Sequence, residues 1–323
     1  MPTITPQALP GLRSQLAPIL HLFDNPDCSD IMINAGGAAV FAEIDGVMLH
    51  QPHVQFEEQT VRSIITWIAS INGQAVDADH PLLTARITND QHVVIARVAA
   101  ALPPCSVTGP MIDIRLFPRL RPLSELLARE MVTVDQAGVI QHAIADRRNI
   151  LVAGGTGAGK STVTAMIVSE FPPDDRVIII EDTAEIQAHN RNLVRLEALQ
   201  PIEGDAAFAI GHQEIPIRAL VTLAYRLRPD RIVIGEVRGP EAYDLLQSLN
   251  SGHRGSVSTI HANSAPDALA RLADCALEAN VGWSETTATA RVHDAIDLVI
   301  FVERHHGRRR VADLYVPPGK ESR

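Results

Sequence analysis

The residues from Gly154 to Ser161 match the pattern G-x-x-x-x-G-K-[ST] and constrain this chain more than any other feature. The apolar run 150–153 predicts a buried strand before the pattern, and the spacing within 162–171 predicts a helix after it. Glycines let backbone N–H groups approach phosphates, and a helix N-terminus attracts anions. The residues expected to bind phosphate are Gly154, Gly155, Thr156, Gly157, Ala158, Gly159, Lys160, Ser161 and Thr162.

Two residues of this loop have specific expected roles. Lys160 is expected to reach the β- and γ-phosphates of ATP, and the Ser161 hydroxyl is expected to bind Mg²⁺. A glycine-rich turn without a ligand is the alternative. The strand, loop and helix predicted in this order favour the phosphate site.

The net charge, the cysteines and the apolar runs of the chain argue against several classes of protein. The formal charge of −10 on 323 residues argues against a broad nucleic-acid-binding surface, and no sequence-specific nucleic-acid binding is expected. The three widely spaced cysteines form neither a disulfide framework nor a zinc motif, which indicates a reducing cytosol. The sequence lacks an apolar run of about 20 residues and a signal-peptide pattern, so we expect a cytoplasmic protein without a transmembrane segment.

The first 117 residues predict a small α+β domain. Helical spacing appears at 11–24 and 56–71, and strand patterns appear at 31–34, 40–44, 82–87, 92–100 and 111–117. Two prolines then mark a linker, which we place at residues 118–124.

Residues 125–323 predict an α/β domain with a mostly parallel sheet, because strands and helices alternate around the loop. The expected strands are 150–153, 177–180, 193–196, 231–234 and 256–260, and the expected helices are 123–129, 135–145, 217–227, 241–249 and 266–276. A hairpin around Gly307 is expected from 297–302 and 310–316. We interpret its basic turn, 304–310, as solvated rather than as a contact for a partner or lipid.

Acidic residues follow two of these strands. Glu181 and Glu185 would stand at the edge of the sheet where ligands bind, either holding Mg²⁺ and orienting water or as solvated acids. Glu236 is well placed to polarise an attacking water, and the alternative is a salt bridge to Arg238. Gly235 stands where a Walker-B aspartate is usual and is expected to leave room for water or metal.

Histidine and arginine supply further candidates. His261 follows a predicted strand and could bond a phosphate or Glu236, although a single histidine is often structural. Arginines suit phosphate binding, although most surface arginines are only solvated. The arginines considered are Arg97, Arg115, Arg226, Arg228 and Arg231.

Four segments in this order and spacing resemble the secretion ATPase superfamily: GGTGAGKST, IIIEDTAEI, RPDRIVIGEVRGPEAYDLL and STIHANS. They resemble its Walker A, Asp, Walker B and His boxes and cover roughly residues 120–300. The short N-terminal domain and the Walker B stretch are most similar to conjugal-transfer ATPases of the TrbB type. The resemblance implies a RecA-like motor domain, a PAS-like N-terminal domain and a homo-hexamer that docks on inner-membrane secretion-system components.

The resemblance also implies roles for single residues. Glu181 and Glu185 would serve the metal and water, Glu236 would be the catalytic glutamate, and His261 would sense the nucleotide state. Arg97 and Arg115 match the N-terminal-domain arginines that reach phosphate. A type IV pilus or tight-adherence pilus motor, a RecA-like DNA motor and a ring scaffold with little turnover remain as alternatives.

Overall fold

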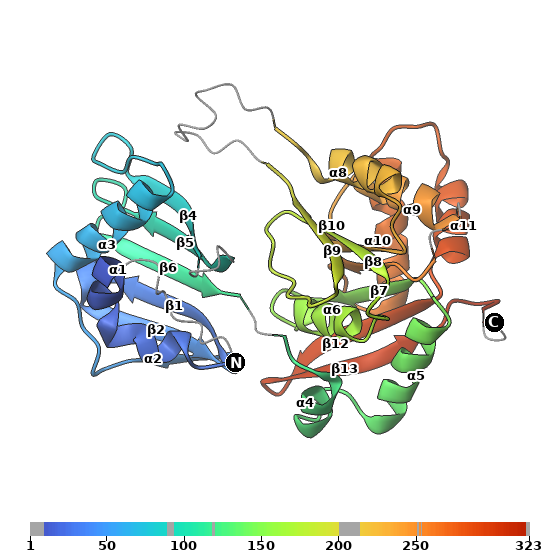
Figure 1. Ribbon diagram of the computed structural model, residues 1–323, viewed down its shortest axis with the longest axis horizontal. Coiled ribbons are helices and arrows are strands. Elements are labelled where there is room, and N and C mark those ends of the chain that lie inside the picture. The colour runs from blue at the N-terminus through green and yellow to red at the C-terminus, as the bar shows by residue number, and fades with distance from the viewer. Residues whose placement is uncertain are drawn as a thin grey trace. The chain divides into compact units, whose positions relative to one another are not determined.

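The computed structural model describes residues 10–88, 94–117, 120–199, 214–250, 252 and 254–320. The chain divides into two compact units between Arg119 and Leu120, and each is described by itself (Figure 1). Part of the predicted linker, 118–119, lies outside the described residues, and helix α4 (Leu123–Ala128) begins within its predicted span. The predicted domain boundaries at residues 117 and 125 stay a prediction that limited proteolysis would test.

The first unit contains an antiparallel sheet in the order β3-β2-β1-β6-β5-β4. Its strands are β1 (Cys28–Asn34), β2 (Ala39–Ile44), β3 (Val47–His50), β4 (Leu82–Thr88), β5 (Val94–Ala101) and β6 (Met111–Leu116). The start of the predicted strand 92–100 lies outside the described residues. Strand β3 is absent from the prediction because all four of its residues are exposed, so it shows no alternation of buried and exposed positions.

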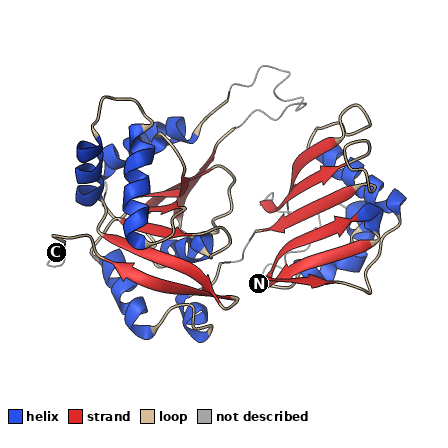
Figure 2. Cartoon of the chain, turned by 180° about the vertical axis from the view of Figure 1, so that it is seen from behind, coloured by secondary structure: helices blue, strands red, loops and turns tan. Residues whose placement is uncertain are grey.

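Helices cover one face of this sheet (Figure 2). Helix α3 (Glu58–Ile71) agrees with the prediction and buries an apolar stripe. The single helix predicted at 11–24 is instead α1 (Pro10–Gln15), a 3-10 turn (Ala17–Ile19) and α2 (Leu20–Phe23). Pro18 explains the break, because proline has no N–H with which to continue an α-helix.

The second unit contains a sheet in the order β13-β12-β7-β11-β10-β8-β9, with every pair parallel except β12 and β13. The mostly parallel α/β sheet is therefore confirmed. The strands are β7 (Ile150–Gly154), β8 (Arg176–Glu181), β9 (Asn192–Glu197), β10 (Arg231–Val237), β11 (Val257–Ile260), β12 (Leu298–His305) and β13 (Arg308–Tyr315).

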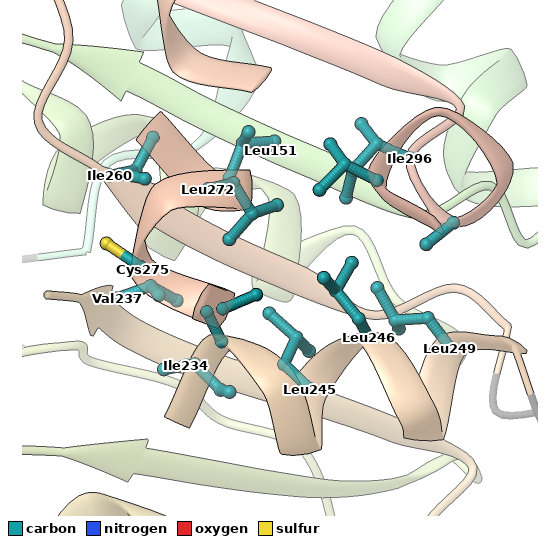
Figure 3. Close-up of a cluster of buried hydrophobic side chains, with 14 of the residues drawn as sticks. Leu151, Ile234, Val237, Leu245, Leu246, Leu249, Ile260, Leu272, Cys275 and Ile296 are labelled. Atoms are coloured by element: carbon teal, nitrogen blue, oxygen red, sulfur yellow. The ribbon is translucent and has the colours of Figure 1, made fainter. Parts of the chain in front are cut away.

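Two hydrophobic cores cover the two faces of this sheet. One contains α4, α5 (Val134–Ala145) and α6 (Lys160–Ser169). The other contains α8 (Ile217–Ala224), α9 (Glu241–Asn250), α10 (Ala265–Leu277) and α11 (Glu285–Ala295), and Figure 3 shows its packing. Helix α11 is absent from the prediction because its buried residues, Ala288, Val292 and Ala295, form only a thin apolar stripe. None of the helices described is long and apolar enough to cross a membrane.

Parallel pairing determines where the polar residues meet. Strands β7, β11, β10 and β8 are consecutive neighbours in the sheet, and their carboxyl ends lie at one edge. The predicted phosphate-binding loop, residues 154–162, follows β7, and His261 follows β11. Glu236 lies near the end of β10, and Glu181 ends β8. Residues separated by about 100 positions in sequence are thus brought to one edge, where open α/β sheets bind ligands.

Candidate functional site

The phosphate-binding loop connects a buried strand to a helix, as predicted. All five residues of β7 are buried, and α6 begins at Lys160. Gly154 has to be glycine, because a Cβ there would lie 2.2 Å from the carbonyl oxygen of its strand partner Val302. Residues 155–157 are exposed, so their backbone is accessible to a ligand.

Lys160 places its ammonium inside this loop. Its Nζ donates to Gly154 O and Gly155 O, each at 3.1 Å. The residue is only 9% exposed, and this burial lowers the pKa of the ammonium. A partly desolvated cation inside a glycine-rich loop is suited to receive an anion.

Lys160, His261 and Glu236 form a continuous series of contacts. Lys160 Nζ lies 3.3 Å from His261 Nδ1, and His261 Nε2 lies 2.6 Å from Glu236 Oε1. Burial and the neighbouring Lys160 lower the pKa of His261, although Glu236 opposes them. His261 is therefore a mostly neutral imidazole between a cation and a carboxylate at neutral pH.

The two carboxylate oxygens of Glu236 differ in their environment. Oε2 accepts from Arg238 Nε at 2.6 Å, and Arg238 Nη1 also donates to Asp182 Oδ2 at 3.2 Å. Oε1 is buried and has no hydrogen-bond partner among the described residues, because its contact with His261 is short but not aligned as a hydrogen bond. The salt bridge that the sequence offered as an alternative to catalysis is present, and it leaves one carboxylate oxygen able to accept a proton.

Glu181 lies directly beside Gly235. A Cβ at Gly235 would lie 2.7 Å from Glu181 Cγ, so the space expected for water or metal holds this side chain instead. Glu181 Oε1 accepts from the backbone N–H groups of Glu185 at 3.0 Å and Ile186 at 2.9 Å. Burial nevertheless raises the pKa of Glu181 to about 7, although these N–H groups and Arg195 favour the charged form.

Other predicted residues lie elsewhere. Glu185 contacts Glu181 through its backbone, because its N–H donates to Glu181 Oε1. Arg231 is 2% exposed and pairs with Asp175 at 2.6 Å at the start of β10, so its role is structural. Arg97 and Arg115 are cross-strand neighbours in the first unit, where Arg115 Nε donates to Asp30 Oδ1 at 2.9 Å.

Sequence reasoning missed several contributors to the site. Asp182 pairs with Arg238, and no local sequence signal indicates this contact, because the two residues follow different strands. Thr259 Oγ1 donates to Gly235 O at 2.5 Å and joins β11 to β10. Within the turn interpreted as solvated, Arg309 is half-buried and donates from Nε to Gly157 O at 3.1 Å.

A metal ion at this site would be held by few protein groups. The described residues contain no group of three or more histidines, cysteines or acids arranged to hold an ion. Mg²⁺ bound with a nucleotide requires few protein ligands, because water and phosphates supply the others. The hydroxyl of Ser161 at the first turn of α6 therefore fits such an ion without an acidic cluster.

Comparison with known proteins gives matches over most of this chain. The profile of the type II/IV secretion system protein family matches residues 14–306. The conjugal transfer protein TrbB of Rhizobium radiobacter is 36% identical over 255 residues, covering 78% of this chain and 72% of the relative. The type IV secretion system protein PtlH of Bordetella pertussis is 32% identical and covers 91% of each chain.

A solved structure shows the same fold. The X-ray structure of the Legionella pneumophila ATPase DotB matches with a TM-score of 0.66 at 22% identity, covering 94% of this chain and 80% of that chain. The resemblance to secretion ATPases and the α/β fold are thereby confirmed. This chain belongs to the type II/IV secretion system protein family.

Proposed function

We propose that this chain hydrolyses ATP as the motor of a type IV secretion or conjugal transfer system. The observation that carries the proposal is the series of contacts from Lys160 through His261 to Glu236 at the end of β10. It joins a phosphate-binding loop to a carboxylate that can act on water. Conjugal transfer is favoured over a pilus motor because TrbB of Rhizobium radiobacter is 36% identical.

Phosphate binding would use the backbone of residues 154–162 together with Lys160. Its ammonium already lies within 3.1 Å of two loop carbonyls, so little movement is needed to face an entering phosphate. Mg²⁺ held by Ser161 and the phosphates would neutralise part of the charge that develops during transfer. The exposed loop backbone at 155–157 leaves the nucleotide a route of entry.

Glu236 would act as the general base. Arg238 holds its Oε2, while the buried Oε1 lacks a hydrogen-bond partner among the described residues. An oxygen in this state gains a hydrogen bond when a water enters, and it can then accept the proton of that water. Glu181, with a pKa of about 7, lies on the other side of Gly235 and would supply a second, readily protonated carboxyl.

His261 would make the position of Glu236, the proposed general base, depend on whether a nucleotide is bound. Lys160 Nζ lies 3.3 Å from His261 Nδ1 and 3.4 Å from His261 Nε2, and Nε2 also lies 2.6 Å from Glu236 Oε1. When phosphate draws Lys160 away, the histidine loses one neighbour and can turn toward the ligand. Such a change at the base would couple nucleotide binding to the catalytic carboxylate, which is the sensing role expected of this residue.

The proposed activity also requires a particular assembly and a place in the cell. We infer a hexameric ring at the cytoplasmic face of the inner membrane, bound to other secretion-system components. Arg97 and Arg115 of the first unit would reach phosphates within that ring. Support comes from the family and from the separation of these arginines and the P-loop into two units.

Phosphate release from purified protein tests the chemistry. Turnover should require both ATP and Mg²⁺ and should not be stimulated by DNA, because a DNA motor is the competing enzyme class. Nucleotide binding without turnover would favour the ring scaffold.

An experiment in the source cell separates the two kinds of motor. Lys160→Ala should abolish DNA transfer, whereas loss of pilus-dependent movement with normal DNA transfer would favour the pilus motor.

A further inference from the structure

The β12–β13 hairpin contacts the phosphate-binding loop at more than one point. Val302 on β12 is the strand partner of Gly154, and Arg309 on β13 donates from Nε to Gly157 O at 3.1 Å. The stem of Arg309 passes along the loop, because a Cβ at Gly159 would lie 3.3 Å from Arg309 Cδ. Arg309 therefore follows the outer side of the loop from Gly159 to Gly157.

The peptide between Gly157 and Ala158 has two distinct sides. Its carbonyl oxygen accepts from Arg309, whereas its N–H, on Ala158, donates to Gly155 O at 3.3 Å. Gly155 O also accepts from Lys160 Nζ, so this N–H and the lysine ammonium converge on one carbonyl oxygen. The carbonyl and N–H of a trans peptide point in opposite directions, so a bond that fixes the carbonyl also fixes the N–H.

We propose that Arg309 is a positioning residue for nucleotide binding, which holds the 157–158 peptide with its N–H toward the phosphates. An inward N–H binds a phosphate oxygen, whereas an inward carbonyl would repel it. Gly157 has φ of +68° and no side chain, so the reversed peptide is accessible unless something holds it. The inference rests on the proposed function, because it requires a nucleotide in this loop.

The backbone that presents Arg309 is itself anchored. Val311 on the same strand donates from N to Met131 O at 2.8 Å and accepts from Gln136 Nε2 at 3.0 Å. The strand is therefore held, two residues beyond Arg309, against Met131 and against Gln136 on α5. Arginine suits the position because its Nε lies close to the stem, where lysine has a methylene group that cannot donate.

The neighbouring Arg308 provides a matched control. Its side chain is 82% exposed and pairs at 3.5 Å with Glu130, which is equally exposed. Arg308→Gln therefore removes the same charge one residue away without removing a contact with the loop. The test compares Arg309→Gln, Arg309→Lys and Arg308→Gln with the parent.

The measurements are the Kd for ADP by calorimetry, the KM and kcat for ATP, and the Tm without nucleotide. Loss of one charge-assisted hydrogen bond should raise the Kd and KM of Arg309→Gln about tenfold. Its kcat should stay within about twofold of the parent, because the contact is the same in the ground and transition states. Arg309→Lys should fall between Arg309→Gln and the parent, and Arg308→Gln should match the parent.

Several results would overturn the inference. Parent-like affinity in both Arg309 variants would show that the contact does not position the loop. An equal loss of nucleotide affinity in Arg308→Gln would show that the effect comes from the net charge of the protein. A lower kcat with unchanged KM would place Arg309 in the chemical step instead. If Arg309→Gln has a low Tm, Arg309→Lys carries the comparison, and a parent that binds no nucleotide would refute the proposed function itself.

Discussion

The side chain of Glu181 occupies the space into which a side chain at Gly235 would project, with Glu181 Cγ 2.7 Å from the position of a Cβ. Glu181 ends β8, and Gly235 lies near the end of the neighbouring parallel strand β10. At the position where the sequence predicts a Walker-B aspartate, Gly235 therefore leaves room for an acid from the adjacent strand. This relationship explains why an apparently incomplete motif is compatible with an acidic site.

Gly235→Ala should destabilise the protein by about 1–3 kcal/mol, the usual cost of overpacking. The added methyl group has to displace Glu181, whose Oε1 is fixed by two backbone N–H groups. Urea unfolding of the parent, Gly235→Ala, Glu181→Ala and the double variant measures the coupling between the two sites. Strictly additive free energies would show that the two side chains do not compete for this space.

The stability of the protein should depend on pH through Glu181. Its pKa is about 7 in the folded state and 4.5 when unperturbed, so the folded state binds the proton more tightly. The stability that this proton contributes is complete below pH 4.5 and is lost as pH rises through 7.

Glu181→Gln should remove this contribution, because the amide stays neutral and its oxygen can still accept the two N–H bonds. Between pH 5 and 8 the parent should lose stability relative to this variant, by an amount on the order of 2–3 kcal/mol. Urea unfolding in EDTA, without nucleotide, makes the comparison. Parallel pH curves for the two proteins would contradict the prediction.

Much of this architecture follows from local sequence patterns. The buried runs before Gly154, Glu181 and Glu236 predicted their strands, because central parallel strands are apolar throughout. The approach of His261 to both Lys160 and Glu236 depends on strand order, β7-β11-β10-β8, which no local pattern specifies. The contacts of Arg238 with Asp182 and of Arg309 with Gly157 were missed for the same reason. The sequence around an arginine does not indicate which distant residue its side chain will contact.

Lys160→Ala should abolish ATP turnover while the protein stays folded. The ammonium is the cation placed inside the P-loop, and its hydrogen bonds join loop carbonyls rather than the hydrophobic cores. Phosphate release should fall to background, and circular dichroism should match the parent. Parent-like turnover would contradict the assigned role of the lysine.

Glu236→Gln should bind ATP nearly as well as the parent and hydrolyse it about 10²–10⁴ times more slowly, the usual effect of losing a general base. Glutamine keeps the volume and can still accept from Arg238, but it cannot take the proton of water. Binding by calorimetry and turnover by phosphate release have to be measured on the same preparation. A collapse of affinity would assign Glu236 to structure or metal binding.

Turnover should depend on assembly, because Arg97 and Arg115 belong to a different unit from the P-loop. An arginine supplied to the transition state can contribute about 10³–10⁵ in rate, so a protomer without a shared site should be nearly inactive. Specific activity should therefore rise with protein concentration over the range in which light scattering reports ring formation. Constant specific activity while the mass falls to that of a monomer would refute this dependence.

Arg115→Ala should lower turnover in the assembled protein without abolishing ATP binding. Arg115 pairs with Asp30 at 2.9 Å on the face of the sheet opposite the buried core, and an ion pair with so exposed an arginine contributes little to stability. Arg62→Ala is the matched control, because Arg62 pairs with Glu58 on helix α3, which covers the other face of the sheet. Equal turnover in the two variants, with equal mass by light scattering, would exclude Arg115 from the site. A selective loss of turnover in Arg115→Ala would show that the first unit supplies a cation to the nucleotide.

Mixing inactive Lys160→Ala with Arg115→Ala tests whether Arg115 acts on the nucleotide of its own protomer or of a neighbour. Recovery of activity in mixed rings requires that Arg115 act on a neighbouring protomer.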